Sequence, residues 1–389
     1  MNNRKFYRKN KIIWLVLKII KLKVVIKLRR NKSLVVIIML MITILVGCSK
    51  GKDKDDVAIN LFDMQKANNI VKEYLNNVVL GDLDTANSLL TEELLTSNKN
   101  IGEGISKIIS FKSDQSIEGS NYAYFIYNIV RSSEVEPKSD LENVTFKIRK
   151  QNKEYKIDEI KSKSEKEVYI KGSGLRIIDE EGGKSSLIIN LNTLPQDTYL
   201  RDNKIMLYKD IVPKESFGKV CLSFTGDRVA ITTTNNKDSY ICIAYIDEAL
   251  MTSSQPDSTG GNSETSLGAS NIDELEDVLE KPIAQKLVTV DLLKGSKVTK
   301  FIFSEEEDIL QVSYNNEHNK ERIRLYKSDD GALIQTDLDT MFPEDKYNIS
   351  NGKFEGDVFK FKVTASEGQQ QDISGDYILD LENLEINKL

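Results

Sequence analysis

The sequence predicts an α+β region followed by an all-β region, both behind a removable amino-terminal segment. Three observations predict this: a helical repeat of apolar residues after residue 57, strand-like alternation from residue 107 onward, and a basic segment before a short apolar run. The 389-residue chain is long enough for two domains. We expect a signal peptide with a long basic n-region over 1–47, a lipid-anchored tether over 48–56, and domains over 57–170 and 171–389.

The amino-terminal segment has the features of a bacterial export signal. Every charged residue before Asp53 is basic, and the apolar run Leu34–Val46 is shorter than the roughly 20 residues that a bilayer-spanning helix needs. The run ends in Leu45-Val46-Gly47-Cys48, which resembles the lipobox of bacterial lipoproteins. That resemblance implies cleavage between Gly47 and Cys48 and attachment of diacylglycerol to the Cys48 thiol.

A lipid on Cys48 would hold the mature protein to a membrane. Each buried acyl methylene contributes about 0.8 kcal/mol, so two or three chains, palmitate for example, anchor a protein stably. We therefore expect a location on the extracytoplasmic face of the cell membrane, with an uncleaved signal anchor as the alternative. The richness in Lys, Ile and Asn is typical of a low-GC Gram-positive bacterium.

Cleavage changes the charge of the protein. Twelve of the 54 Lys and Arg residues precede Cys48 and none of the 60 Asp and Glu residues do, so the formal charge changes from −6 to −18. An acidic protein repels phosphate backbones and anionic headgroups. We expect no nucleic-acid partner and attachment to the membrane through the lipid alone.

Few residues are available for metal or nucleophilic chemistry. Cys221 and Cys242 sit in apolar runs and are expected to be buried thiols, with a disulfide between neighbouring strands as the alternative. His318 is the single histidine and lies in a polar turn, so a His-based metal site or catalytic triad is excluded. We expect no cofactor, no metal site and no catalytic residues.

The first domain is expected to begin with helices. Apolar residues recur at helical spacing up to Gly81, which closes the helix, and Asp82 and Asp84 mark the start of a second, shorter helix through Leu95. Strand periodicity follows at 107–111, 121–130, 143–148 and 155–160. A helix pair before a curved four-stranded sheet resembles the NTF2-like domains of many bacterial lipoproteins, and this resemblance covers about residues 57–170.

The second domain is expected to be all-β. Short strands are predicted at 187–191, 204–208, 220–224, 229–233, 240–246, 287–290, 298–303, 309–314, 322–326, 358–363 and 377–381. The phrase Ser223-Phe224-Thr225-Gly226-Asp227-Arg228-Val229 resembles the strand-turn-strand unit of TolB-type propeller blades, with Thr-Gly-Asp where Pro-Asp-Gly is usual. The resemblance implies a degenerate β-propeller, and a β-sandwich is the alternative.

A recurring strand end supports the propeller interpretation. Apolar strands close on acidic or glycine turns near 288–295, 323–331 and 377–382, at uneven spacings of about 36 and 54 positions, against the roughly 40–50 of regular blades. Residues 252–277 are rich in Ser, Gly, Thr and acidic residues, and we expect a disordered insertion there.

Four segments contain residue types that occur in functional sites. Lys171-Gly172-Ser173-Gly174 lacks the Gly-Lys-Ser/Thr ending of a phosphate loop, which favours a domain junction. Glu305–Asp308 and Asp329–Gly331 lack the spacing of a Ca²⁺ loop and favour solvated turns. Four aromatic residues alternate between the two faces of one predicted strand and favour core packing over a pocket lining: Tyr122, Tyr124, Phe125 and Tyr127.

These observations favour a lipid-anchored protein of the cell envelope that binds or scaffolds another envelope protein or a surface ligand. The alternative is an extracytoplasmic hydrolase-like enzyme that uses a pocket of either domain, with Asp158 or Asp227 as the acid/base group. A third interpretation is a spacer that needs no pocket.

Overall fold

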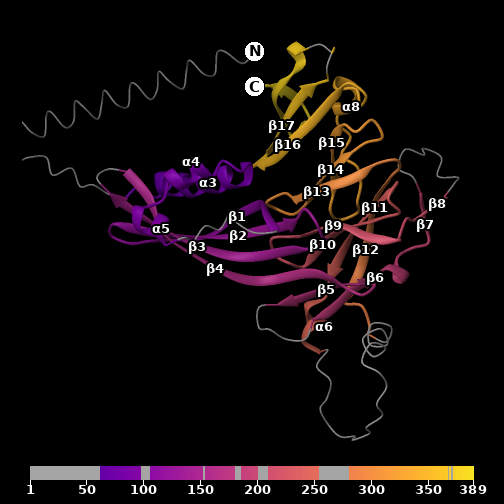
Figure 1. The fold of residues 1–389 in the computed structure, drawn as a ribbon, viewed down its shortest axis with the longest axis horizontal. Coiled ribbons are helices and arrows are strands. Elements are labelled where there is room, and N and C mark those ends of the chain that lie inside the picture. Colours follow the sequence, from indigo (N-terminus) through magenta and orange to yellow (C-terminus); the bar gives the residue numbers. More distant parts are fainter. Residues whose placement is uncertain are drawn as a thin grey trace, which may run out of the picture. The chain divides into compact units, whose positions relative to one another are not determined.

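The computed structural model describes residues 62–97, 106–151, 154–179, 185–199, 209–253, 280–366, 368 and 371–389, which all belong to one compact unit, Leu61–Leu389. This part of the chain is mostly β-strand with few helices, as predicted (Figure 1). The signal segment, the tether, the predicted strand 204–208 and residues 254–277 of the predicted insertion lie outside the described residues. None of the described helices is long and apolar enough to cross a membrane.

The first predicted helix is present and ends where its local signals place it. Helix α3 (Met64–Leu80) begins at Asp63, whose side chain accepts a hydrogen bond from the Lys66 backbone N–H at 3.0 Å. Gly81 ends the helix with a φ of 78°, the left-handed conformation that glycine adopts without a steric penalty.

The second predicted helix is instead two short ones, α4 (Leu83–Ser88) and α5 (Glu92–Thr96). The chain between them pairs with a neighbouring strand, because Leu90 forms a parallel bridge with Ile157 and the Thr91 N–H donates to the Ile157 carbonyl at 2.9 Å. This long-range pairing interrupts the helical pattern, and α5 starts again from a Thr91 cap.

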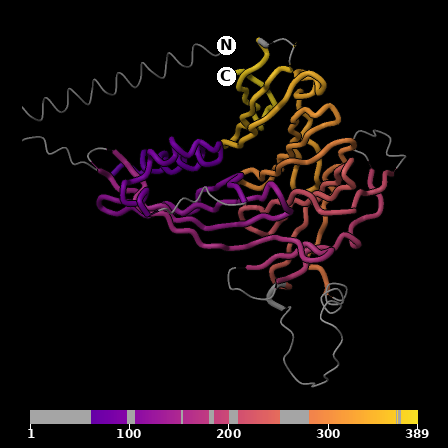
Figure 2. Tube along the Cα trace, viewed as in Figure 1, coloured from indigo at the N-terminus to yellow at the C-terminus, as the bar shows by residue number. Residues whose placement is uncertain are grey.

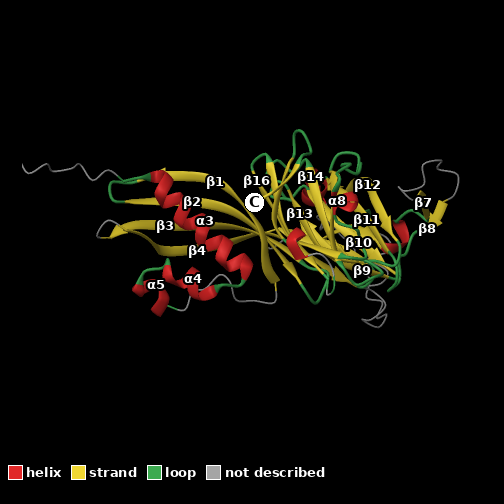
Figure 3. Cartoon of the chain, turned by 90° about the horizontal axis from the view of Figure 1, so that it is seen from above, coloured by secondary structure: helices red, strands yellow, loops and turns green. Residues whose placement is uncertain are grey.

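A curled antiparallel sheet follows the helices (Figure 3). Its six strands pair in chain order: β1 (Ser106–Glu118), β2 (Tyr122–Ser133), β3 (Ser139–Gln151), β4 (Glu154–Lys171), β5 (Gly174–Asp179) and β6 (Ser186–Asn190). The four strands predicted in this region are therefore longer in the structure than their apolar patterns indicated. The boundary predicted at residue 171 falls in the tight β4–β5 turn, where Gly172 has a φ of 60°, so the sheet continues across it.

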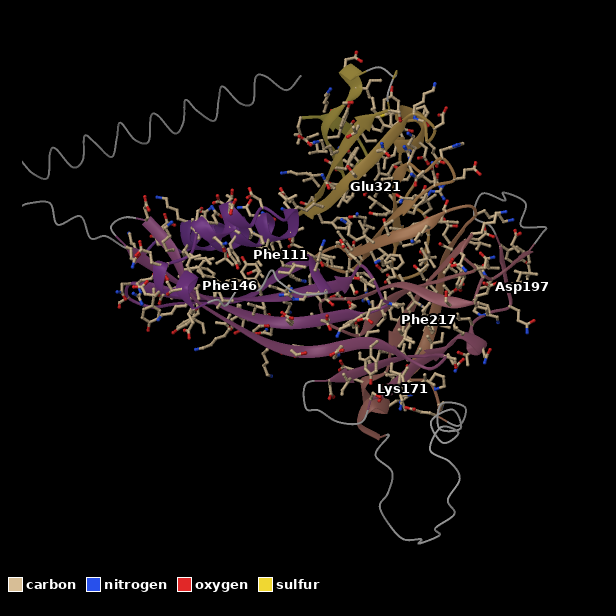
Figure 4. The ribbon with its side chains drawn as sticks, in the orientation of Figure 1. Phe111, Phe146, Lys171, Asp197, Phe217 and Glu321 are labelled. Carbon is tan, nitrogen blue, oxygen red and sulfur yellow. The ribbon has the colours of Figure 1, made fainter. Side chains whose placement is uncertain are left out.

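The two faces of this sheet contribute to different cores. On one face, side chains such as Phe125, Tyr127 and Phe146 pack with α3, α4 and α5, and Figures 1 and 3 show these helices lying along β1–β4. On the opposite face, Val130 and Leu141 belong to a second core that includes the strands after residue 216. Figure 4 labels Phe111 and Phe146 beside the helices and Phe217 in the second core.

Three antiparallel meanders make up the rest of the described chain, and they follow one another in the chain colours of Figure 2. The first meander contains β9 (Ser216–Leu222), β10 (Arg228–Thr234), β11 (Ser239–Ile246) and β12 (Ala284–Leu293). The second contains β13 (Lys297–Phe303), β14 (Ile309–Asn315) and β15 (Glu321–Lys327). The third contains β16 (Tyr347–Glu355), β17 (Val358–Ala365), β18 (Gly375–Asp380) and β19 (Ile386–Lys388). Smaller elements are a β7 (Asp197–Tyr199) and β8 (Lys209–Ile211) pair, α6 (Glu248–Ser253), α8 (Leu338–Met341), and the 3₁₀ turns Leu191–Thr193 and Gln371–Ile373.

One backbone hydrogen bond recurs in all three meanders. An aspartate ends the first turn of each meander. Its backbone carbonyl accepts a hydrogen bond from the N–H of a residue at or just beyond the end of the third strand. These pairs are Asp227 with Ile246 at 2.8 Å, Asp308 with Ser328 at 2.8 Å and Asp357 with Leu381 at 3.0 Å. The three meanders therefore share this contact. The strand end predicted near 288–295 is not equivalent to the other two, because it belongs to β12, the fourth strand of the first meander.

The third meander closes a separate core. Phe354, Phe359 and Phe361 pack with Ile302, Ile323 and Leu325 from one face of the second meander. The other face of the second meander contributes Phe301, Val312 and Tyr326 to the core beneath β9–β12. The middle meander is therefore buried on both sides.

Tyr127 links β2 to α3. Its hydroxyl donates to Asn68 Oδ1 at 2.5 Å, and burial raises the pKa of Tyr127 to about 12. We expect Tyr127→Phe to lower the free energy of unfolding by about 1 kcal/mol, because Asn68 loses its donor. Tyr124→Phe on the opposite face of β2 should change it by less than about 0.5 kcal/mol. Urea unfolding followed by circular dichroism measures both, and equal effects would contradict the link.

Candidate functional site

Acidic residues cluster on three turns of the first two meanders. The repeated hydrogen bonds to the Asp227 and Asp308 carbonyls place these turns at corresponding ends of the two meanders. We call Ser223–Arg228, Ser304–Ile309 and Ser328–Gly331 the acidic turn face. The first two turns join β9 to β10 and β13 to β14, and the third follows β15. The Ser328 N–H donates to the Asp308 carbonyl at 2.8 Å, which holds the second and third turns together.

The first two turns are built in the same way. Ser223 Oγ donates to Asp227 Oδ1 at 3.2 Å, and Ser304 Oγ donates to Asp308 Oδ1 at 2.7 Å. Each serine oxygen also accepts the backbone N–H of the residue after its aspartate. Both aspartates are therefore part of the turn structure, and both serines are buried.

Glu307 joins the two turns. Its side chain accepts the Thr225 N–H at 2.7 Å and lies 2.8 Å from Thr225 Oγ1, which also lies 2.6 Å from Asp227 Oδ1. Since a hydroxyl has one proton, Thr225 donates to one of the two carboxylates at a time. Arg228 Nη1 donates to the Glu307 carbonyl at 2.6 Å, and its guanidinium lies 5.2 Å from the Tyr245 ring centre.

Lysines from other elements reach these turns. Lys112 of β1 donates to the Glu305 carbonyl, and Lys166 of β4 donates to the Gly226 carbonyl at 3.1 Å. Lys286 of β12 donates to the Asp329 carbonyl at 2.8 Å and lies over the Tyr245 ring. Lys112 Nζ also lies 3.9 Å from Glu306 Oε1, and the side chains of Glu306 and Asp330 are exposed.

The prediction of solvated turns is correct for some acidic residues and wrong for one. Glu305, Glu306, Asp329 and Asp330 are exposed, whereas Glu307 is only 4% exposed. Its partner Thr225 lies 82 positions earlier in the chain, so no local sequence signal indicated this burial. Among the described residues, no group of three or more His, Cys, Asp and Glu side chains could hold a metal ion.

The two predicted acid/base candidates are not brought together. Asp227 lies in the β9–β10 turn, while Asp158 lies on β4 with its side chain 8% exposed. Asp158 Oδ2 is 3.1 Å from Lys147 Nζ and 2.8 Å from Arg149 Nη2. Both contacts come from the neighbouring strand β3, which suits a structural role better than proton transfer.

The remaining candidates have structural positions. Cys221 on β9 and Cys242 on β11 are free, buried thiols separated by β10, and burial raises the pKa of Cys242 to about 12. His318 lies in the β14–β15 turn, as predicted, and residues 171–174 form the β4–β5 turn. Phe125 and Tyr127 are core residues, whereas Tyr122 is 37% exposed. Gly47 and Cys48 lie outside the described residues.

The sequence did not reveal a buried polar cluster between β12 and β15. Asp291 is 3% exposed, and its Oδ2 accepts Tyr326 Oη–H at 2.5 Å and Arg324 Nη1–H at 3.3 Å. Burial raises the pKa of the fully enclosed Tyr326 phenol. The cluster joins the first two meanders, because Asp291 lies on one and both of its side-chain partners lie on the other.

No family model matches the sequence, and no curated protein matches it. A puromycin hydrolase structure is 8% identical with a TM-score of 0.30, covering 71% of this chain and 46% of its own. Oligopeptidase B from Leishmania major is 7% identical with a TM-score of 0.28, covering 75% and 33% respectively. Pyrococcus horikoshii acylaminoacyl peptidase is 8% identical with a TM-score of 0.24, covering 72% and 46%. The chain spans less than half the length of these three proteins, and such TM-scores assign no family or function.

Glu307→Gln tests whether Glu307 joins the two turns. The amide oxygen can still accept the Thr225 N–H, but an –NH₂ group replaces the second acceptor, so the charge-assisted bond from the Thr225 hydroxyl is lost. We expect the free energy of unfolding to fall by about 1–2 kcal/mol. The matched control is Glu306→Gln, whose side chain is 85% exposed and which should cost less than about 0.5 kcal/mol. Chemical denaturation measures both, and an equal loss in the control would refute the joining role.

Proposed function

We propose that this chain is a lipid-anchored extracytoplasmic protein of a bacterial cell envelope that binds or scaffolds another envelope component. The observation that carries the proposal is the lipobox Leu45-Val46-Gly47-Cys48 at the end of an apolar run with only basic residues before it. The thioether-linked lipid on Cys48 would place the protein on the outer surface of the cell membrane.

We further propose that the three meanders are degenerate TolB-type propeller blades. The shared aspartate turn, with the repeated carbonyl bonds of Asp227, Asp308 and Asp357, supports this interpretation over a β-sandwich. The first blade would carry the 252–277 insertion between its third and fourth strands, which lengthens the interval from Asp227 to Asp308 relative to the interval from Asp308 to Asp357. An NTF2-like origin for residues 57–170 is a separate proposal, supported by three helices packed on one face of a curved sheet. The continuation of that sheet through β5 and β6 departs from the predicted four strands.

The acidic turn face is the surface we propose for partner binding. Its exposed carboxylates, Glu305, Glu306, Asp329 and Asp330, stand on turns fixed by internal hydrogen bonds. A rigid surface loses little conformational entropy on association. The enzyme alternative gains no support from Asp158 or Asp227, because both carboxylates are engaged in ion pairs or turn hydrogen bonds.

Fatty-acid labelling in a bacterial host tests the anchor. We expect the wild-type protein to incorporate a labelled acyl chain and Cys48→Ala to incorporate none, since the lipid is attached through the Cys48 thiol. Cys221→Ala should remain fully labelled, because this thiol is buried. Radiolabel or alkyne-palmitate detection on gels gives the readout. Equal labelling of wild type and Cys48→Ala would rule out the lipoprotein assignment.

Charge reversal tests the binding surface. We expect Glu305→Lys with Glu306→Lys to reduce recovery of a stoichiometric partner in detergent pull-down from membranes by at least tenfold, because both side chains are exposed on the turn. Glu382→Lys, an exposed acidic residue outside the acidic turn face, is the matched control and should leave recovery unchanged. The binding surface would have to lie elsewhere if both variants recovered the partner equally.

A further inference from the structure

We propose that one end of the six-stranded sheet contacts the surface of an anionic lipid bilayer. The contact residues form what we call the hairpin patch, which consists of Ile117, Tyr122, Tyr124, Lys147, Arg149 and Lys161. The inference rests on the proposed lipid anchor, which brings this end of the protein to the membrane. It adds a second contact to that anchor, made by the folded part of the chain.

The hairpin patch lies on the face of the sheet opposite α3. Register pairs Ile117 with Tyr124, Tyr124 with Lys147 and Tyr122 with Arg149, so these side chains share one face. Their neighbours Phe125 and Tyr127 alternate to the helix side and are buried. Farther along the strands, β9–β12 cover this same face through the second core, but the hairpin end remains uncovered.

The exposed part of the patch has side chains that suit a membrane interface. Ile117 is 55% exposed and Tyr122 is 37% exposed, so both present apolar surface to solvent. The Tyr122 and Tyr124 rings pack edge to face at 5.5 Å. Tyrosines with an apolar ring and a polar tip are favoured at the boundary between headgroups and acyl chains.

The charge of the patch complements anionic headgroups. Lys147, Arg149 and Lys161 face two anions on β4, Asp158 and Glu159, which leaves one net positive charge. Lys147 Nζ also lies 5.7 Å from the Tyr122 ring centre, which places a cation beside the exposed aromatic side chains. The net positive charge of these five side chains contrasts with the formal charge of −18 of the mature chain, and anionic lipids attract basic segments.

The chain enters the fold at the same end. The Phe62 ring packs edge to face on Tyr155 at 5.0 Å, and the Asp63 N–H donates to Tyr155 Oη at 2.7 Å. Tyr155 pairs with Lys150 at the β3–β4 turn, next to the pair of Arg149 with Lys156. Residues 49–61 separate Cys48 from Phe62, and they span at most about 45 Å when fully extended. A lipid on Cys48 therefore keeps this end of the sheet near the bilayer.

Tryptophan fluorescence can test this contact without background, because Trp14 is the only tryptophan and leaves with the signal. We would purify full-length, lipidated Tyr122→Trp and reconstitute it into phosphatidylglycerol vesicles that contain brominated lipid, which quenches nearby indoles. The matched control is Tyr199→Trp, since Tyr199 is 40% exposed but lies on β7 in a separate sheet. We expect at least threefold stronger quenching for Tyr122→Trp than for Tyr199→Trp.

The charge contribution has its own comparison. Adding Lys161→Glu to Tyr122→Trp should halve the quenching in phosphatidylglycerol vesicles and leave it unchanged in phosphatidylcholine vesicles, with folding checked by circular dichroism. Equal quenching at positions 122 and 199 in lipidated protein would overturn the inference and assign the patch to another occupant. Mass spectrometry of Cys48 separates the two proposals, because an unmodified cysteine would overturn the proposed function itself.

Discussion

The rest of the structure depends on one constraint in the β1–β4 sheet. The helices bury one face at one end of the strands, and β9–β12 bury the other face at the opposite end. Ile129 and Val130 are adjacent in β2 and both almost fully buried, yet Ile129 belongs to the helix core and Val130 to the core beneath β9. Because side chains alternate with a period of two, a one-residue slip would move both into the wrong environment. The register of this sheet therefore fixes the helices and the meanders at once.

Polar contacts at the crossover reinforce that register. Ser139 Oγ accepts the Leu222 N–H at 3.1 Å and donates to the Arg131 carbonyl at 2.8 Å, which ties β9 to the sheet. On the helix side, beyond the end of the apolar core, Arg131 Nε lies 2.9 Å from Glu142 Oε1 with both side chains mostly buried. Loss of one partner of such a pair leaves an uncompensated charge, so an alternative pairing that separates Arg131 from Glu142 is disfavoured.

Local signals predicted the parts of the fold that depend on neighbours in sequence. The helix ending at Gly81 and the apolar strands around Cys221 and Cys242 required only periodicity and a terminator. The break between α4 and α5 and the burial of Glu307 depend on Ile157 and Thr225, which are distant in sequence, so pattern alone could not reveal them. The sequence singled out segments of both candidate surfaces but not their grouping in space, since pairing between strands assembles each surface.

The mature chain as a whole is acidic, whereas the hairpin patch has more basic than acidic side chains. For a protein tethered to a membrane, the local charge near the tether matters more than the total charge. At physiological ionic strength the Debye length is about 8 Å, so exposed acidic groups farther from the bilayer are largely screened. With the proposed anchor, the charges at the end of the sheet near Phe62 would determine how the protein meets the membrane. Because such an anchor would already raise the effective concentration of protein at the surface, the patch would have only to favour one orientation over others. A difference of about 1.4 kcal/mol gives a tenfold bias, so a surface too weak to bind a membrane alone can still orient an anchored protein.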